Sequence, residues 1–459
     1  MTLIKSISGI RGTIGGKQGD CLTPPDIIKF TAGYGSWVKK HNQGRLRVVV
    51  GRDGRTTGEM VSNLVVNTLR MIGIDVTDLG HSTTPTVEVA VSGTGANGGI
   101  ILTASHNPAN WNALKLLNSN GEFLSASDGE EVLFLAESGN IEYSTHDSCG
   151  TYTRDDTWNR KHIDLIAGLD TVDTDLIRKA GFNVVVDCIN SVGGLIIPEL
   201  LERLGVKKVT LLNGKPDGNF AHNPEPLAEH LDGIMNAVKE IGADIGFVVD
   251  PDVDRLAFIS EDGKMFGEEY TLVAISDYIL SKVKGSTVSN MSSSRALKDV
   301  TEKHGCTYYS SAVGEVNVVE EMKRRSAVIG GEGNGGVIYP ALHYGRDALA
   351  GIALFLTLMA EKGISCSSLR STYPSYVMSK RKVTLVAGTD TDKLLVSVKD
   401  HFRNEKIDDR DGIRIDFDHG WVHIRKSNTE PILRIYSEGR SEEEADRYAD
   451  IISDYVKKH

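Results

Sequence analysis

Cysteine is scarce in this sequence, and the few cysteines are spaced far apart. They are Cys21, Cys149, Cys188, Cys306 and Cys366. No Cys-x-x-Cys pair occurs and the number is odd, so neither a zinc site nor a disulfide framework is expected. Cysteines used in this way are typical of a reducing compartment.

The chain also lacks long apolar runs. No uninterrupted apolar stretch approaches the roughly 18 residues of a membrane-spanning helix. The first residues, MTLIKSISGIRG, contain no apolar segment typical of a signal peptide. We therefore expect a cytoplasmic protein with no membrane partner.

An excess of basic residues is missing too. Lysine and arginine number 51 against 62 aspartates and glutamates, and the formal net charge is -11. This balance argues against a protein that binds nucleic acid or an anionic membrane. It does not exclude phosphorylated substrates, because a few arginines and backbone amides can bind phosphate locally.

Length and a repeated pattern indicate several domains. With 459 residues the chain is too long for one core, and about three or four domains are expected. A strand, a polar loop, a helix and another strand follow one another three times, starting at Arg45, Phe182 and Ser286. Short apolar strands that alternate with helices indicate parallel sheets built from βαβ units.

Each copy continues with a further apolar strand that runs into an unusual loop. The three segments are GGIILTASHNP, ADIGFVVDPDVDR and SAVIGGEGNGG. Because ligands bind beyond the carboxyl ends of strands in open α/β sheets, we expect the three loops to face one shared cleft. From about Tyr373 the sequence predicts strands around a loop and then an amphipathic helix, which form a fourth, different domain. The predicted boundaries are 1–150, 151–256, 257–370 and 371–459.

The loop DPDVDR is a candidate metal site. Asp250, Asp252 and Asp254 lie two residues apart, so their carboxylates lean to one side of an extended segment. Three crowded carboxylates repel one another unless a cation neutralises them. Oxygen ligands without cysteine or histidine favour Mg²⁺ over zinc. The alternative is a solvated acidic turn, but the loop directly follows the apolar strand IGFVV, which favours the metal.

Two other loops are candidates for binding a phosphorylated sugar. In GGEGNGG a carboxylate would repel phosphate, so Glu332 and Asn334 suit sugar hydroxyls, with a plain tight turn as an equal alternative. RKSNTEP offers donors that suit a phosphate, with a surface turn as the alternative. These donors belong to Arg425, Ser427, Asn428 and Thr429.

The role of Ser105, in TASHNP, is the least determined by its own segment of the sequence. A hydrolase nucleophile would stand in Gly-x-Ser-x-Gly, whereas Ala104 and His106 flank this serine. His106 is poorly placed to act as the base of its own neighbour, and a serine before Asn-Pro is also a common helix cap or turn. A metal site, a hydroxyl loop and an anion loop together indicate phosphoryl transfer on a sugar. A serine that carries the phosphoryl group would connect them.

Five segments together resemble the α-D-phosphohexomutase family, in the family's order and over almost the whole chain. They are SGIRG, TASHNP, DPDVDR, GEGNGG and RKSNTEP. The resemblance implies an α/β protein with three related domains of mixed sheets and a smaller α+β C-terminal domain around a central cleft. It also implies a mutase acting on a sugar phosphate, as a monomer or homodimer.

The resemblance also implies roles for the residues of the site. Ser105 would be the phosphoserine, and its phosphate together with the three aspartates would hold Mg²⁺. A hexose 1,6-bisphosphate would be the intermediate and activator. Lys115 would be a general acid/base, for which a lysine needs a depressed pKa if it is to accept a proton. Arg11 and Arg255 would stabilise charge, and His106 completes the catalytic set.

Departures from the family's pattern leave the substrate open. Gly335 and Gly336 stand where bacterial members often have Ser-Gly-His, so a histidine role in that loop cannot be transferred. His343 either substitutes for it or is a surface residue. The segments GEVNVVEEM and SNTEP most resemble those of phosphoglucosamine mutases, so the resemblance favours that activity. A broad phosphomannomutase/phosphoglucomutase is the alternative, ahead of a sugar phosphatase or an inactive sugar-phosphate-binding protein.

Overall fold

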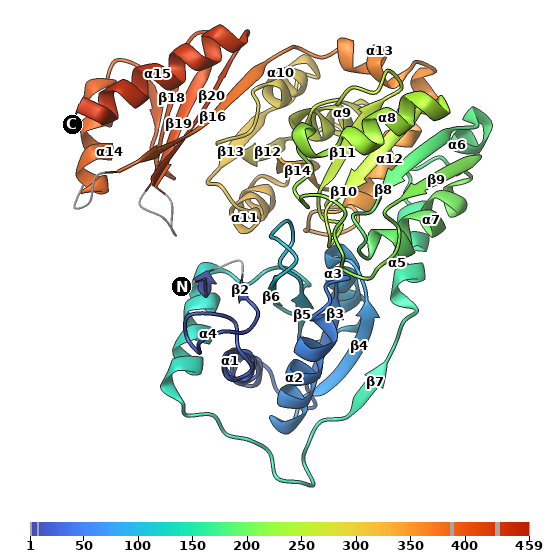
Figure 1. Ribbon diagram of the computed structural model, residues 1–459, viewed down its shortest axis with the longest axis vertical. Coiled ribbons are helices and arrows are strands. Elements are labelled where there is room, and N and C mark those ends of the chain that lie inside the picture. The colour runs from blue at the N-terminus through green and yellow to red at the C-terminus, as the bar shows by residue number, and fades with distance from the viewer. Residues whose placement is uncertain (1, 7–8, 386–389, 427–431, 459) are drawn as a thin grey trace. The chain divides into compact units, whose positions relative to one another are not determined.

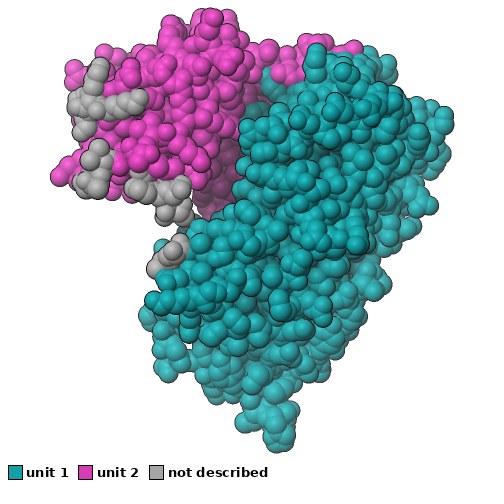
Figure 2. Space-filling view, viewed as in Figure 1, with its two compact units in different colours: residues 1–271, 335–367 teal, residues 272–334, 368–459 magenta. Residues whose placement is uncertain are grey.

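The computed structural model describes residues 2–6, 9–385, 390–426 and 432–458, and contains four β-sheets (Figure 1). It divides into two compact units, which Figure 2 shows in different colours. Unit 1 comprises residues 1–271 and 335–367, and unit 2 comprises residues 272–334 and 368–459. Among the described residues, no helix combines the length and the apolar character needed to span a membrane.

The first sheet has seven strands in the order β1-β2-β6-β5-β3-β4-β7. Strands β5, β3, β4 and β7 run parallel, whereas β1, β2 and β6 add antiparallel pairs. The strands are β1 (Ile4–Ser6), β2 (Gly9–Thr13), β3 (Arg47–Arg52), β4 (Asp75–His81), β5 (Gly98–Leu102), β6 (Trp111–Leu117) and β7 (Tyr152–Arg154). Its helices are α1 (Pro24–His41), α2 (Gly58–Met71), α3 (Thr84–Thr94) and α4 (Ala126–Ser138).

Alternation of side chains along β3 explains why this sheet is covered on both faces. Val48 and Val50 pack in a core with residues of α1, α2 and α4. Val49 points the other way and packs in a second core with α3 and Trp158. A strand buried on both faces needs a continuous apolar run, and Arg47–Arg52 contains one.

The second sheet has the order β11-β10-β8-β9, in which only β11 is antiparallel to its neighbour. Its strands are β8 (Asn183–Asp187), β9 (Lys208–Leu212), β10 (Ile245–Val249) and β11 (Leu256–Ser260). Its helices are α5 (Trp158–Ala167), α6 (Thr174–Ala180), α7 (Gly193–Leu204) and α8 (Asp232–Ile241), with a 3₁₀ turn at Ala228–His230. Unit 1 also contains β15 (Gly336–Ile338) and α12 (Ala348–Lys362), and α12 packs against α5, α6 and α7.

In unit 2, parallel strands follow the order β13-β12-β14, with β12 (Thr287–Asn290), β13 (Tyr308–Ser311) and β14 (Ile329–Glu332). Helices α10 (Ala296–Lys303) and α11 (Glu315–Arg325) pack against these strands. Two further helices, α9 (Glu268–Lys282) and α13 (Cys366–Ser371), run from unit 1 into unit 2.

The C-terminal sheet of unit 2 is entirely antiparallel, in the order β16-β20-β19-β18-β17. Its strands are β16 (Val377–Thr384), β17 (Lys406–Asp408), β18 (Ile413–Asp416), β19 (Trp421–Lys426) and β20 (Ile432–Gly439). Helices α14 (Thr391–His401) and α15 (Glu442–Lys458) complete one apolar core with it.

The predicted repeat and fold class are confirmed. In all three copies the first strand (β3, β8 or β12) lies parallel to the strand before the unusual loop (β5, β10 or β14). The glycine after each helix has a positive φ, as the end of a helix requires: 90° at Gly73, 83° at Gly205 and 69° at Gly305. The unusual loops therefore occupy equivalent places in three related sheets, and the fourth sheet is different, as expected.

Candidate active site

Ser105 lies in the loop after β5, and its backbone has an unusual conformation. Its φ is 48°, in the left-handed region that a residue with a side chain rarely adopts. The Ser105 amide donates to Thr103 Oγ1 at 2.9 Å, and the Thr103 hydroxyl donates to Asp53 Oδ2 at 2.7 Å. The serine is 8% exposed. The loop thus holds one hydroxyl in a fixed position, at the expected end of the strand.

Arg55 holds the backbone of this loop through hydrogen bonds. Its side chain is completely buried, and its Nε pairs with Asp53 Oδ2 at 3.0 Å. The two terminal nitrogens donate at 2.6–2.9 Å to four backbone carbonyls of the loop. These carbonyls belong to Ser105, Asn107, Pro108 and Trp111. Only the planar fork of a guanidinium offers donors in this arrangement.

The DPDVDR loop follows β10, and all three of its aspartates are fully buried. Val253 has a φ of 62°, which is strained for a β-branched residue. Asp250 Oδ1 accepts bonds from the amides of Asp254 at 3.1 Å and Arg255 at 3.2 Å, and so closes the turn on itself. The three residues offer carboxylate oxygens within 4.8 Å of one another.

The two loops meet. Ser105 Oγ donates a hydrogen bond to Asp250 Oδ2 at 2.7 Å, although 145 positions separate the residues in sequence. Burial, and the charges of Asp254 and Asp252, raise the pKa of Asp250 well above its ordinary value. The serine hydroxyl and the acidic cluster therefore form one site in unit 1.

In both Asp252 and Asp254, one carboxylate oxygen accepts hydrogen bonds from neighbouring side chains, and the other accepts none from the described residues. Asp252 Oδ2 accepts from Lys115 Nζ at 2.7 Å and from the Thr84 hydroxyl at 2.5 Å. Asp254 Oδ2 accepts from Arg346 at 2.7 Å and is 3.5 Å from Lys115 Nζ. Among the described residues, neither Oδ1 atom has a hydrogen-bond partner. Buried oxygens without donors, beside a third carboxylate, fit a hard divalent cation.

Lys115 is positioned for this cluster but has a pKa shifted upwards. Burial by itself would lower the pKa of its ammonium group, but the charges of Asp252 and Asp254 outweigh burial and raise it above the ordinary value. The predicted role as a base would need the opposite shift. Its contacts with Asp252 at 2.7 Å and Asp254 at 3.5 Å place Lys115 to neutralise carboxylate charge.

The predicted residues Arg11 and Arg255 lie near His106, the neighbour of Ser105, since the charges of both lower the pKa of this histidine. Arg11 on β2 lies in register opposite Ala113 of β6, the strand that carries Lys115. Burial, and then the nearby charge of Arg255, lower the pKa of Arg11. His106 Nδ1 is 3.4 Å from Ser105 Oγ. Burial, with Arg255 the largest of several cationic neighbours, lowers the pKa of His106 well below its ordinary value, so this histidine is neutral.

The predicted sugar and phosphate loops belong to unit 2. Glu332 ends β14 and is buried, and its Oε1 accepts from Asn290 Nδ2 at 2.9 Å and the Gly314 amide at 3.2 Å. Asn334 lies in the turn that follows. Arg425 on β19 is 3.0 Å from Asp411 Oδ2. The other predicted phosphate ligands, Ser427, Asn428 and Thr429, lie outside the described residues.

Three residues of the site were not predicted from the sequence: Arg55, Thr84 and Arg346. Arg55 had a signal, since GRDGR follows an apolar strand as the other loops do. Arg346 and Thr84 had none, because each acts across 92 or more positions of sequence. His343 is not a surface residue: its side chain is 9% exposed and contacts two buried carboxylates.

Four family models match the chain in order. They describe the phosphoglucomutase/phosphomannomutase alpha/beta/alpha domains I, II and III and the C-terminal domain. The matched residues are 3–139, 160–263, 267–376 and 383–454.

Individual proteins agree with these matches. A phosphoglucomutase/phosphomannomutase of Thermococcus kodakarensis is 36% identical over 96% of either chain. A phosphoglucosamine/phosphogalactosamine mutase of Sulfurisphaera tokodaii is 31% identical over 98% of either chain. The crystal structure of a phosphoglucomutase/phosphomannomutase family protein from Burkholderia thailandensis has a TM-score of 0.85 and 25% identity, covering 100% of this chain and 98% of that one. The chain therefore belongs to the phosphoglucomutase/phosphomannomutase family and is a phosphohexomutase, an isomerase that works by phosphotransfer.

Proposed function

We propose that the chain interconverts the 6-phosphate and the 1-phosphate of a hexosamine or hexose through a phosphorylated Ser105 and a bisphosphorylated sugar. The observation that carries this proposal is the contact of Ser105 Oγ with Asp250 Oδ2, at 2.7 Å. A hydroxyl on a fixed loop beside buried carboxylates can accept a phosphoryl group and return it.

Asp250, Asp252 and Asp254 would hold Mg²⁺ together with the phosphate on Ser105. The two Oδ1 atoms without donors and the absence of nitrogen and sulfur ligands in this loop support a hard cation. When bound, Mg²⁺ would neutralise negative charge on the phosphoryl group. Arg346 and Lys115 hold the opposite carboxylate oxygens, so they would keep Asp254 and Asp252 oriented.

The transfer step balances within the chain and its substrate. The bond from phosphorus to Ser105 Oγ breaks as a bond from phosphorus to the sugar hydroxyl oxygen forms. The hydroxyl proton passes, in net terms, to Ser105 Oγ, which then donates to Asp250 as in this structure. The sugar, now bisphosphorylated, reverses its orientation, and its other phosphoryl group is then transferred to Ser105 by the reverse step. Lys115, Arg11 and Arg255 would stabilise the charge that develops on the phosphoryl oxygens.

The candidate residues of unit 2 suit the other groups of a sugar phosphate. Glu332 and Asn334 suit hydroxyls, and Arg425 with Ser427, Asn428 and Thr429 suits the phosphate that is not reacting. Both sites would have to accept the sugar in two orientations, because the intermediate reverses. A carboxylate and a guanidinium that recognise local groups rather than a whole ring meet this requirement.

Two candidates for the preferred sugar correspond to two kinds of relative, which are named for different mutase activities. We put glucosamine phosphate first, as the segments GEVNVVEEM and SNTEP indicate, and the Sulfurisphaera relative carries a name of that kind. A broad mannose and glucose phosphate mutase is the second candidate. The observation that favours it is the higher identity, 36% against 31%, of the relative named phosphoglucomutase/phosphomannomutase.

Phosphorus NMR tests the proposal directly. The protein, with Mg²⁺ and a trace of hexose 1,6-bisphosphate, receives the 1-phosphates of glucosamine, mannose and glucose separately. Much faster conversion of glucosamine 1-phosphate supports the first candidate, whereas comparable or faster rates on the other two support the second. Free inorganic phosphate without any isomer would overturn the mutase proposal in favour of a phosphatase.

A variant separates the Ser105 mechanism from mere binding. Ser105→Ala should lose turnover while it keeps much of its affinity for the sugar phosphate. Ser138→Ala changes an exposed serine at the end of α4 and is the matched control. Equal turnover of wild type and Ser105→Ala would contradict the phosphoserine.

A further inference from the structure

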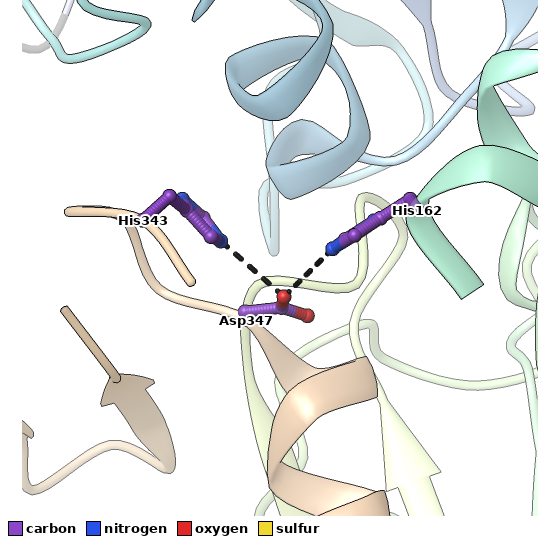
Figure 3. A group of neighbouring side chains, drawn as sticks. All are labelled: His162, His343 and Asp347. Atoms are coloured by element: carbon purple, nitrogen blue, oxygen red, sulfur yellow. Dashed lines mark hydrogen bonds and ion pairs between the residues drawn. The ribbon is translucent and has the colours of Figure 1, made fainter. Parts of the chain in front are cut away.

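Besides the acidic loop, unit 1 contains a second buried cluster, which is made of two histidines and an aspartate (Figure 3). Asp347 Oδ2 accepts from His162 Nε2 at 3.0 Å and from His343 Nε2 at 3.3 Å, and both rings point at this carboxylate. Asp347 Oδ1 accepts from the amides of Leu349 at 2.8 Å and Ala350 at 3.1 Å and so caps α12.

The contacts of the ring nitrogens indicate that protons, rather than a metal ion, hold this cluster together. His343 Nδ1 faces Glu88 Oε2 at 3.3 Å, so both of its nitrogens face carboxylates. Facing carboxylates favour the doubly protonated form of an imidazole, and that form has no lone pair for a metal. Consistently, although burial alone would lower the pKa of His343, contacts with Asp347 and Glu88 raise it to about 10. His162 Nδ1 is engaged too, 3.0 Å from Thr86 Oγ1.

The elements joined by this cluster are those that support the acidic loop. Arg346, directly before Asp347, donates to Asp254 Oδ2 at 2.7 Å, and the Ala348 amide donates to the Val253 carbonyl at 3.3 Å. On α3, one turn before Glu88, Thr84 contacts Asp252 through both its hydroxyl and its amide. The start of α12 and the start of α3 therefore each hold one aspartate of the loop.

We propose that His162, His343 and Asp347, together with Glu88, are positioning residues that lock α3, α5 and α12 together and so keep Arg346 on Asp254. This inference rests on the proposed role of the acidic loop in binding a divalent cation. None of the four needs to touch the substrate or the cation. They act through Arg346 and Thr84, which fix the orientation of Asp254 and Asp252 and leave their Oδ1 atoms available to the ion.

Binding of Mn²⁺ alone, measured by electron paramagnetic resonance of the free ion, tests the proposal without sugar or turnover. His343→Gln and Asp347→Asn should each weaken Mn²⁺ binding by about 10-fold or more, as loss of supporting contacts around metal ligands does. Asparagine still caps a helix, so Asp347→Asn separates the histidine contacts from the capping role. His304→Gln, which breaks a histidine–aspartate contact of 2.7 Å in unit 2, is the control and should bind Mn²⁺ normally.

A double-mutant cycle identifies the route of the effect. If the cluster acts through Arg346, His343→Gln should cost little further affinity once Arg346→Ala is present. Circular dichroism at the assay temperature ensures that only folded variants are compared. Variants that melt earlier but bind Mn²⁺ as the wild type does would reduce the cluster to a structural role and overturn the proposal.

Two further outcomes are distinguishable. Zn²⁺ that binds tightly to Asp254→Asn but not to His343→Gln would make the cluster a metal site and also overturn the proposal. A wild type that shows the expected Mn²⁺ cycle but no mutase turnover would instead overturn the proposed function and leave the positioning role in place.

Discussion

Ser105 Oγ donates to Asp250 Oδ2 at 2.7 Å, and this contact joins the group that would carry phosphate to the cluster that would bind the cation. The two residues lie in the loops that follow equivalent strands, β5 and β10, of two related sheets. Repetition of one α/β unit thus produces two loops that face each other within unit 1. A chemical site arises where neither sheet alone has one.

Asp250→Asn should separate stability from activity. Asp250 is buried and repelled by Asp254 and Asp252, so a neutral amide should stabilise the metal-free protein by on the order of 1–2 kcal/mol. The same change removes a ligand, and turnover at a fixed Mg²⁺ concentration should fall by at least about 100-fold. Urea unfolding with a chelator and a mutase assay measure the two effects. Asp262→Asn, in an exposed turn, should change neither, and a fall in both quantities would contradict the repulsion argument.

Arg55→Lys should be severe although it conserves the charge. A lysine cannot donate to four carbonyls and Asp53 at once, so buried acceptors are left without donors. We expect a loss of about 3–5 kcal/mol in the free energy of unfolding and a loss of turnover with it. Arg154→Lys is the matched control, because its contact with Asp78 is half exposed and is worth about 1 kcal/mol at most. Similar stability of the two variants would show that the clamp is unimportant.

The sequence was informative where the structure is local. Apolar strands of five residues that end in polar loops identify Ser105 and the three aspartates, and the spacing of strands and helices predicts the sheets. The glycines that end the helices are visible for the same reason, since a turn at that place needs a positive φ. These features depend on neighbours in the chain.

Contacts made by folding were not predictable. His162 and Asp347 are 185 positions apart, and nothing local in either segment indicates their pairing. A role as a base would require a depressed pKa for Lys115, but two aspartates reach it from another sheet and, against the effect of burial, raise its pKa. Long-range electrostatics of this kind appears only when the fold is known.

A divalent cation should stabilise the folded protein. An ion that binds only the native acidic loop raises the free energy of unfolding by RT ln(1 + [L]/Kd), about 2.7 kcal/mol at 100 times Kd. Thermal unfolding with and without Mg²⁺ should therefore show an increase in Tm that a chelator reverses. Asp254→Asn should largely abolish the increase, whereas Asp262→Asn should preserve it. An equal increase in both variants would place the ion elsewhere.

The stability contributed by His343 should disappear in alkaline solution. In an unfolded chain the pKa of His343 would be about 6.5. Burial alone would lower this pKa, but Asp347, on the turn before α12, and Glu88, on α3, face the imidazole and raise it to about 10. The ring of His162, on α5, lies beside them. A histidine whose pKa is higher in the folded state stabilises the folded protein fully at a pH below its pKa in the unfolded chain. This contribution is lost as the pH rises towards 10, the pKa in the folded protein. Urea unfolding of wild type and His343→Gln should therefore differ by a few kcal/mol at pH 6 and progressively less at pH 8 and pH 10. A difference that stays constant with pH would mean that packing, rather than the charge on His343, provides the stability.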